Sequence, residues 1–151
     1  MTTVRRKANY RVSLSAITRF TRAQAAEFYS IHIELHSLFG QYAFVIEINK
    51  DTPQSHQLLQ LAFAKDIKTG TYPVDGSSSK FHQLLLLLFN GRPEDEKFTQ
   101  YEAKSGTVHV EAHRDKDHEH FSIKIAVTVE SADGESFAIE GKSEIYLKHR
   151  Q

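Results

Sequence analysis

The sequence predicts an all-β protein: a single antiparallel β-sandwich or flattened barrel of about nine strands, with one short helix allowed near residues 22–28. Two observations carry this prediction. Apolar residues recur at every second position in many segments, and Gly, Pro, Asn, Asp and Ser gather between those segments. A period of two sends alternate side chains to opposite faces of a strand, so one face is buried while the other faces water.

The clearest alternation lies near the C-terminus and predicts a β-hairpin over residues 120–147. The turn is supplied by residues 131–135, which read Ser-Ala-Asp-Gly-Glu, and apolar alternation resumes after it. Lys124 falls on the face expected to meet water. Five residues are expected to be buried on the first strand: Phe121, Ile123, Ile125, Val127 and Val129.

The N-terminal part predicts a basic arm followed by strands. Residues 1–9 are expected to form the arm, and residues 10–14 begin to alternate. Thr21 to Gln24 has the spacing of a helix capping box, which is the reason for allowing a helix there. Residues 29–36 and 42–48 alternate on either side of Gly40, so they predict a second hairpin.

Two Leu-rich segments, 56–64 and 81–89, fit either a helix or a strand. Leu favours helices, and Pro53 and Gly70 resemble a helix start and stop around the first segment. Both runs nevertheless have strand length and lie among strands, so we predict strands. The run from Leu84 to Leu88 is apolar on both faces, which favours a central strand covered on both sides.

Two further strands are predicted between and after the Leu-rich segments. Residues 70–74 predict a short edge or corner strand, because Pro73 has no N–H to donate to a neighbour. Residues 106–113 alternate again and predict another strand.

Composition narrows the classes of function. The 151 residues are expected to form one domain spanning 1–151, and the absence of Cys excludes disulfides, thiolate metal sites and cysteine nucleophiles. Lys plus Arg equals Asp plus Glu at 19 each, and a net charge of zero argues against strong nonspecific binding to nucleic acid. No apolar run has the length of a membrane span, so we expect a soluble, cytoplasmic protein of bacterial type.

One predicted strand contains Gly70-Thr71-Tyr72, and a later one contains Ser105-Gly106-Thr107-Val108 and is followed by the amphipathic hairpin. With this pattern, the segment from residue 68 to 147 resembles small bacterial β-sandwich domains of unknown function. Such families are commonly secreted lipoproteins, from which this chain departs because it shows no signal segment or lipobox. The resemblance implies the fold and supplies no catalytic residue.

Histidine and glutamate form two matched rows that could bind a metal. If 32–36 and 109–113 are strands, each presents His, Glu and His on one face, and these groups are competent ligands for zinc or iron. The alternative is that they simply populate the solvent face of amphipathic strands, and we favour it. The metal hypothesis requires the two rows to lie on adjacent strands. The candidate ligands are His32, Glu34, His36, His109, Glu111 and His113.

No other motif indicates a chemistry. His118-Glu119-His120 is expected in an acidic turn that would bind metal only weakly, and His82 is expected to be a core histidine. The nucleophile elbow and the glycine-rich nucleotide-binding loops do not occur in the sequence. We therefore predict no catalytic residue and no cofactor.

The leading functional hypothesis is a non-enzymatic binding or self-assembly module, most simply a homodimer with a protein or a small hydrophobic ligand as further partner. The second is a carrier of a small hydrophobic ligand, held in a barrel cavity near Leu84 to Leu88. The third is a metal-dependent enzyme built on the two His-x-Glu-x-His rows.

Overall fold

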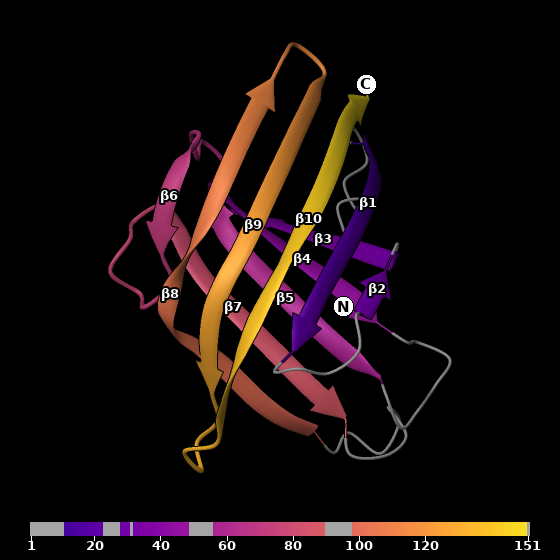
Figure 1. The fold of residues 1–151 in the computed structure, drawn as a ribbon. Coiled ribbons are helices and arrows are strands. Elements are labelled where there is room, and N and C mark those ends of the chain that lie inside the picture. The colour runs from indigo at the N-terminus through magenta and orange to yellow at the C-terminus, as the bar shows by residue number, and fades with distance from the viewer. Residues whose placement is uncertain (1–10, 23–27, 31, 49–55, 90–97, 151) are drawn as a thin grey trace.

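All the described secondary structure is β-strand. The computed structural model describes residues 11–22, 28–30, 32–48, 56–89 and 98–150, and no helix lies within these ranges. This confirms the all-β prediction. The described residues form ten strands, labelled in Figure 1: β1 (Arg11–Arg22), β2 (Phe28–Ser30), β3 (His32–Leu38), β4 (Gln41–Ile48), β5 (Gln57–Ala64), β6 (Gly70–Pro73), β7 (Phe81–Phe89), β8 (Phe98–Arg114), β9 (His118–Glu130) and β10 (Ser136–Arg150).

The strands form one antiparallel sheet that nearly closes on itself. Their order is β2-β1-β10-β9-β8-β7-β5-β4-β3, and β6 pairs only with β8 as the predicted edge strand. At the two ends of this order β1 approaches β3 and β2 approaches β4. The architecture is therefore the flattened barrel rather than two separate sheets.

The barrel has two walls that cross obliquely. β1, β10, β9 and the upper half of β8 form the front wall, and β3, β4, β5 and β7 form the rear wall (Figure 1). β8 belongs to both, because its upper half pairs with β6 and its lower half with β7. A bulge between Ala103 and Ser105 bends it, as bulges do. Gly106 follows at φ 99, where a Cβ would overlap the carbonyl oxygen of Ala126.

The core fills the space between the two walls. At its upper end four aromatic rings pack with centroid separations from 5.1 to 6.5 Å, in tilted and edge-to-face arrangements that such rings prefer. These rings belong to Tyr42, Phe44, Phe63 and Phe121. The register prediction for the hairpin is confirmed, since its five apolar residues are at most 4% exposed and Lys124 is exposed.

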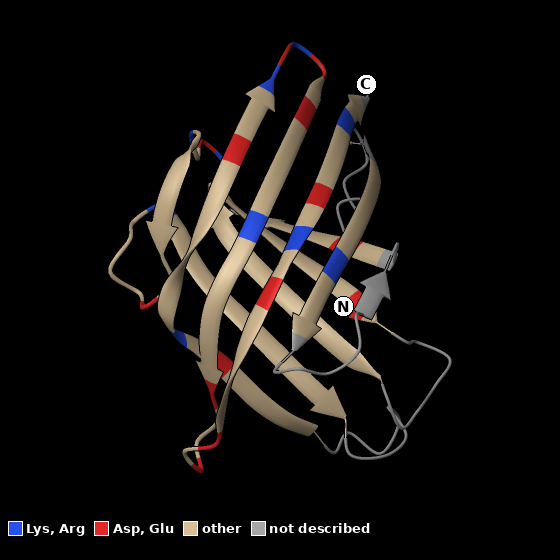
Figure 2. Cartoon of the chain, in the orientation of Figure 1, with Lys and Arg blue, Asp and Glu red and all other residues tan. Residues whose placement is uncertain are grey.

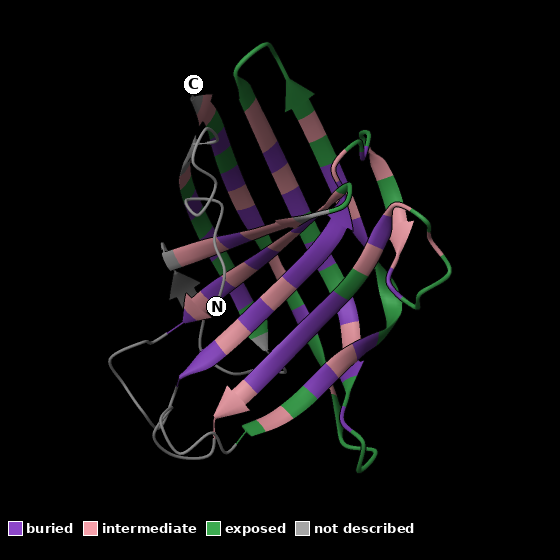
Figure 3. Cartoon of the chain, turned by 180° about the vertical axis from the view of Figure 1, so that it is seen from behind, coloured by how far each residue is buried: buried purple, intermediate pink, exposed green. Residues whose placement is uncertain are grey.

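The two ambiguous Leu-rich segments are strands, as predicted. β5 and β7 pair with each other in the middle of the rear wall, which Figure 3 shows from behind as largely buried. Leu84 and Leu86 belong to the core, whereas Leu85 and Leu87 alternate with them and stay 8% exposed outside the core cluster. An amphipathic helix would need apolar residues only at every third or fourth position. A run that is apolar at every position instead suits a strand whose two faces are both covered.

Two predictions on local segments fall wholly or partly outside the described residues. The basic arm, 1–9, lies outside them, and so do residues 23–27 of the predicted helix. Arg22 and Phe28, at the ends of that helix, belong to strands β1 and β2. Within the described ranges the structure contains no helix that is long and apolar enough to cross a membrane.

Candidate functional site

The structure does not bring the two histidine rows together. The first row lies on β3 and the second on β8, and β7, β5 and β4 separate these strands in the sheet order. In both rows the alternate residues, such as Leu35 and Val110, point into the core, so the described ligands lie on the outer face of opposite walls. Among the described residues no group of three or more His, Asp or Glu is arranged to hold a metal ion.

The described residues of the two rows differ in burial and in the groups that they contact. Glu34 and His36 are half-buried on the outer face of β3, and the side chain of His32 lies outside the described part of the structure. On β8, His109 Nδ1 is 2.8 Å from the hydroxyl oxygen of Thr71, Glu111 is exposed, and His113 belongs to a ring stack described below.

Residues 118–120 begin β9 instead of forming the predicted turn. They alternate across the sheet, so His118 and His120 face outward while Glu119 faces into the barrel opposite Leu147. The turn itself is shorter, and the Asp115 carboxylate closes it by accepting hydrogen bonds from the backbone N–H groups of Asp117 and His118.

Glu119 closes the upper mouth of the barrel through a network of side chains. Its carboxylate accepts a hydrogen bond from the Tyr42 hydroxyl at 2.5 Å and from Arg114 Nε at 3.2 Å, and lies 2.6 Å from His149 Nε2. Arg114 also donates to the Lys65 carbonyl oxygen. The Glu119 side chain is only 11% exposed, and three partners occupy its oxygens. Such a satisfied carboxylate stabilises the fold and offers little to a ligand.

The outer face of the front wall carries a stack of three rings from three adjacent strands. His113, His120 and Tyr146 lie at directly paired positions of β8, β9 and β10. The two imidazole rings are 5.9 Å apart at 22°, and the rings of His120 and Tyr146 are 4.4 Å apart and parallel within 1°. The pairing of these strands therefore sets an ordered aromatic row on the surface.

Glu144 holds this row in place. Its carboxylate lies 2.7 Å from His120 Nε2, accepts a hydrogen bond from Ser122 at 2.8 Å, and forms an ion pair with Lys142 at 2.8 Å. Partial burial alone would raise the pKa of Glu144, but the hydrogen bonds from Lys142, His120 and Ser122 outweigh it and lower the pKa. A carboxylate that stays ionised is a fixed anchor for the imidazole ring.

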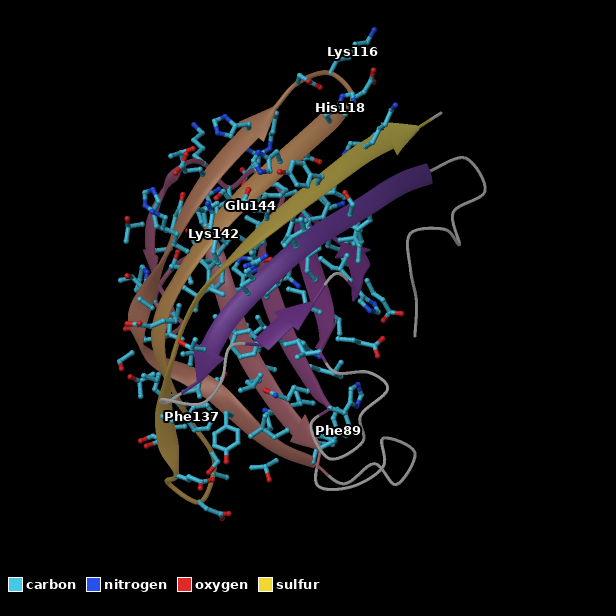
Figure 4. The ribbon with its side chains drawn as sticks, turned by 45° about the vertical axis from the view of Figure 1, so that its right-hand side comes forward. Phe89, Lys116, His118, Phe137, Lys142 and Glu144 are labelled. Atoms are coloured by element: carbon cyan, nitrogen blue, oxygen red, sulfur yellow. The ribbon has the colours of Figure 1, made fainter. Side chains whose placement is uncertain are left out.

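A hollow of about 310 Å³ lies beside the end of the ring stack. Tyr146, next to it, is 46% exposed, and Ile17 at the diagonal position on β1 is 47% exposed. Figure 4 labels His118 near the upper end of β9 and Glu144 below it on the same wall. We call the outward-facing residues Ser15, Ile17, His118, His120, Tyr146 and Lys148 the ring-stack site. The hollow is lined by Leu14, Ser15, His118, Glu119, His120, Tyr146, Leu147 and Lys148.

Sequence reasoning missed this site, although one signal for it was present. Ile145 and Leu147 flank Tyr146 in the sequence, so a strand that buries both of them turns Tyr146 toward water. A large aromatic side chain on the polar face of an amphipathic strand is unusual and can indicate a binding surface. The neighbours from β1 and β9 that complete the site could not be identified in this way, because strand pairing brings them beside Tyr146.

Comparison of the chain with protein-family models, with curated proteins and with solved structures found no match, so the resemblance expected from the sequence stays a prediction.

Proposed function

We propose that the protein is a non-enzymatic binding module and that it takes its ligand at the ring-stack site. One observation carries the proposal: an exposed aromatic side chain lines a hollow, and an exposed aliphatic side chain lies near it on the same sheet face. Tyr146 and Ile17 are two of the few large apolar side chains that the described surface exposes. Contiguous apolar surface with a few placed polar groups is typical of binding sites.

The rigidity of the site supports recognition. The stack is built on three hydrogen-bonded strands, and Glu144 orients its central ring. A surface whose side chains are already ordered loses little conformational entropy when a ligand binds. Among the described hydrogen bonds around the stack, the Ser122 hydroxyl donates to the Glu144 carboxylate, and no hydroxyl is bonded to an imidazole, the base that pairs with serine in nucleophilic sites.

A fragment screen followed by amide chemical shifts in NMR spectra tests the proposal. We expect the fragments that bind to shift the amides of Ser15, Tyr146 and Lys148 together. Ser15→Phe should abolish these responses, because it places a fourth ring in the hollow. The matched control is Ala126→Phe, which adds the same ring to an exposed position of the same wall away from the hollow. Fragments that bind elsewhere, or responses that survive Ser15→Phe, would refute the proposal.

Self-association is a second candidate, favoured by a different observation. Phe39 lies in the turn between β3 and β4 with its side chain 97% exposed. A fully solvated aromatic ring gains free energy when it is buried against a partner. We also note that acidic and basic positions are mixed on the front wall (Figure 2), so net charge does not keep copies apart.

Light scattering across micromolar to millimolar protein tests this second candidate. We expect the wild-type chain to reach the mass of a dimer as concentration rises, and Phe39→Ser to remain monomeric. Monomer mass for the wild-type chain at every concentration would contradict self-association.

The carrier hypothesis receives less support from the described residues. The upper interior near Leu84 is occupied by the packed rings of Phe44, Phe63 and Phe121. Side chains that pack in this way fill a barrel instead of lining a chamber.

A further inference from the structure

We infer that the ligand of the ring-stack site is a flat ring bearing an acidic group, an aryl carboxylate or aryl phosphate, whose ring extends the stack beside Tyr146 while its anion meets Lys148. The inference rests on the proposed function and names the class of ligand. Three features of the molecule carry it: where the stack ends, which charges line the hollow, and how far apart Tyr146 and Lys148 lie along β10.

The stack ends where a fourth ring would fit. The positions paired across the front wall are His113, His120, Tyr146 and then Ser15 on β1. The first three carry rings, whereas the fourth carries a small hydroxymethyl group beside the hollow. Adjacent strands are about 4.8 Å apart, which is close to the separation of stacked rings. A planar ligand above Ser15 would therefore continue the row at its existing spacing.

The charges around the hollow favour an anion. The carboxylate of Glu119 is turned into the barrel and bonded there, as described above. Each lining imidazole already has a carboxylate partner, since His118 lies 3.2 Å from Asp115 and His120 lies 2.7 Å from Glu144. Lys148 is exposed and forms no ion pair among the described residues. Its ammonium group is thus the charge lining the hollow that is available to pair with an anionic ligand.

The spacing along β10 sets the size of the ligand. Tyr146 and Lys148 are two residues apart and point to the same face, so their Cα atoms lie about 6.7 Å apart. That distance suits an acidic group attached to the ring directly or through one or two bonds. The hollow of about 310 Å³ lies at the small end of ligand sites, which also fits one ring.

NMR titration with three probes tests the inference: phenyl phosphate, phenol and inorganic phosphate. We expect phenyl phosphate to shift the amides of Ser15, Tyr146 and Lys148 and to bind more tightly than either of the other probes. Lys148→Gln should weaken phenyl phosphate about three- to five-fold, the usual effect of one exposed ion pair, and leave phenol unchanged. Lys124→Gln, which removes another exposed cation from the same wall, should change neither.

A second variant tests the ring. Tyr146→Leu should weaken phenyl phosphate about three- to ten-fold through lost stacking, and leave inorganic phosphate unchanged. Equal binding of phosphate and phenyl phosphate, or of phenol and phenyl phosphate, would overturn the inference. If fragments from the earlier screen occupy the site but phenyl phosphate does not, this inference fails while the proposed function stands. If nothing occupies the site, both fail.

Discussion

Phe39 and Gly40 form the two-residue turn between β3 and β4, and both have positive φ, at 36° and 79°. Such values define the hairpin turn that suits the twist of antiparallel strands, and they favour Asn or Gly because a bulky side chain is strained there. Phe39 is also 97% exposed. No contact of the exposed ring within the described fold offsets this strain, so we expect Phe39 to lower the stability of the monomer.

We therefore predict that Phe39→Asn stabilises the monomer by about 1 kcal/mol, because Asn tolerates the left-handed region better than Phe. Urea denaturation measures the free energy of unfolding. Gly40→Ala is the control with the opposite sign and should destabilise the protein. An added Cβ there would meet no atom within 4 Å, so the positive φ alone is the cause of the expected loss. A less stable Phe39→Asn variant would show that the ring packs usefully within its own chain.

Glu144 gives a pH-dependent prediction at the same scale. Its pKa is lowered in the folded protein, so the unfolded chain binds a proton more readily than the folded one. The resulting stability is present above the unfolded pKa, about 4.3, and is lost as pH falls through the lower folded value. Glu144→Gln should therefore be less stable than the wild-type protein at neutral pH.

The difference between the two proteins should shrink as pH falls below about 4.3, where the wild-type carboxylate becomes protonated too. Denaturation midpoints measured from neutral pH to pH 3 follow this change. Glu140→Gln, an exposed position on the same strand, is the matched control and should show no such trend. A constant difference across the whole range would rule out this electrostatic role.

At the scale of the element, the β9–β10 hairpin shows how a period of two determines burial. Ile125 is 3% exposed in the core, whereas its neighbour Lys124 is exposed on the outer face. Ile125→Ala should destabilise the protein by about 2–5 kcal/mol, because apolar contact is lost and a cavity remains. Lys124→Ala should change stability by less than about 0.5 kcal/mol. Chemical denaturation of both variants in parallel tests the contrast, and the reverse order would shift the register by one residue.

At the scale of the whole molecule, the Glu119 network joins elements far apart in the chain. The carboxylate on β9 binds Tyr42 of β4 in the rear wall, Arg114 of β8 and His149 of β10. Removing it leaves three polar groups without their shared acceptor at the upper mouth of the barrel. The network thus couples the two walls where no backbone pairing connects β9 to β4.

Glu119→Ala should destabilise the protein by about 2–3 kcal/mol, the range expected when partly buried donors lose an acceptor. Glu111→Ala, an exposed carboxylate of the same wall, is the control and should have little effect. Urea denaturation gives both values, and a double-mutant cycle with Tyr42→Phe isolates the contact between the walls. Additive effects of the two substitutions would show that this contact does not couple the walls.

Particular residues predicted those parts of the fold in which a short stretch of sequence decides which side chains are buried. Alternation identified the core face of β9, and Pro73 identified an edge strand. The Leu84–Leu88 run left helix and strand open, because Leu serves in both and the run is apolar on every side. Glu119 was assigned to a turn because its neighbours are charged, whereas its position in the period of β9 sends it inward to Tyr42.

The sequence by itself determined the amphipathic strands and which face of each is buried, because the two-residue period of a strand is a local property. Only the tertiary structure decided which strands are neighbours. It separated the matched rows of β3 and β8, and it set Tyr146 beside His120 and Ser15. The reason is that strand order depends on how the whole chain closes its core, and no short segment contains that information.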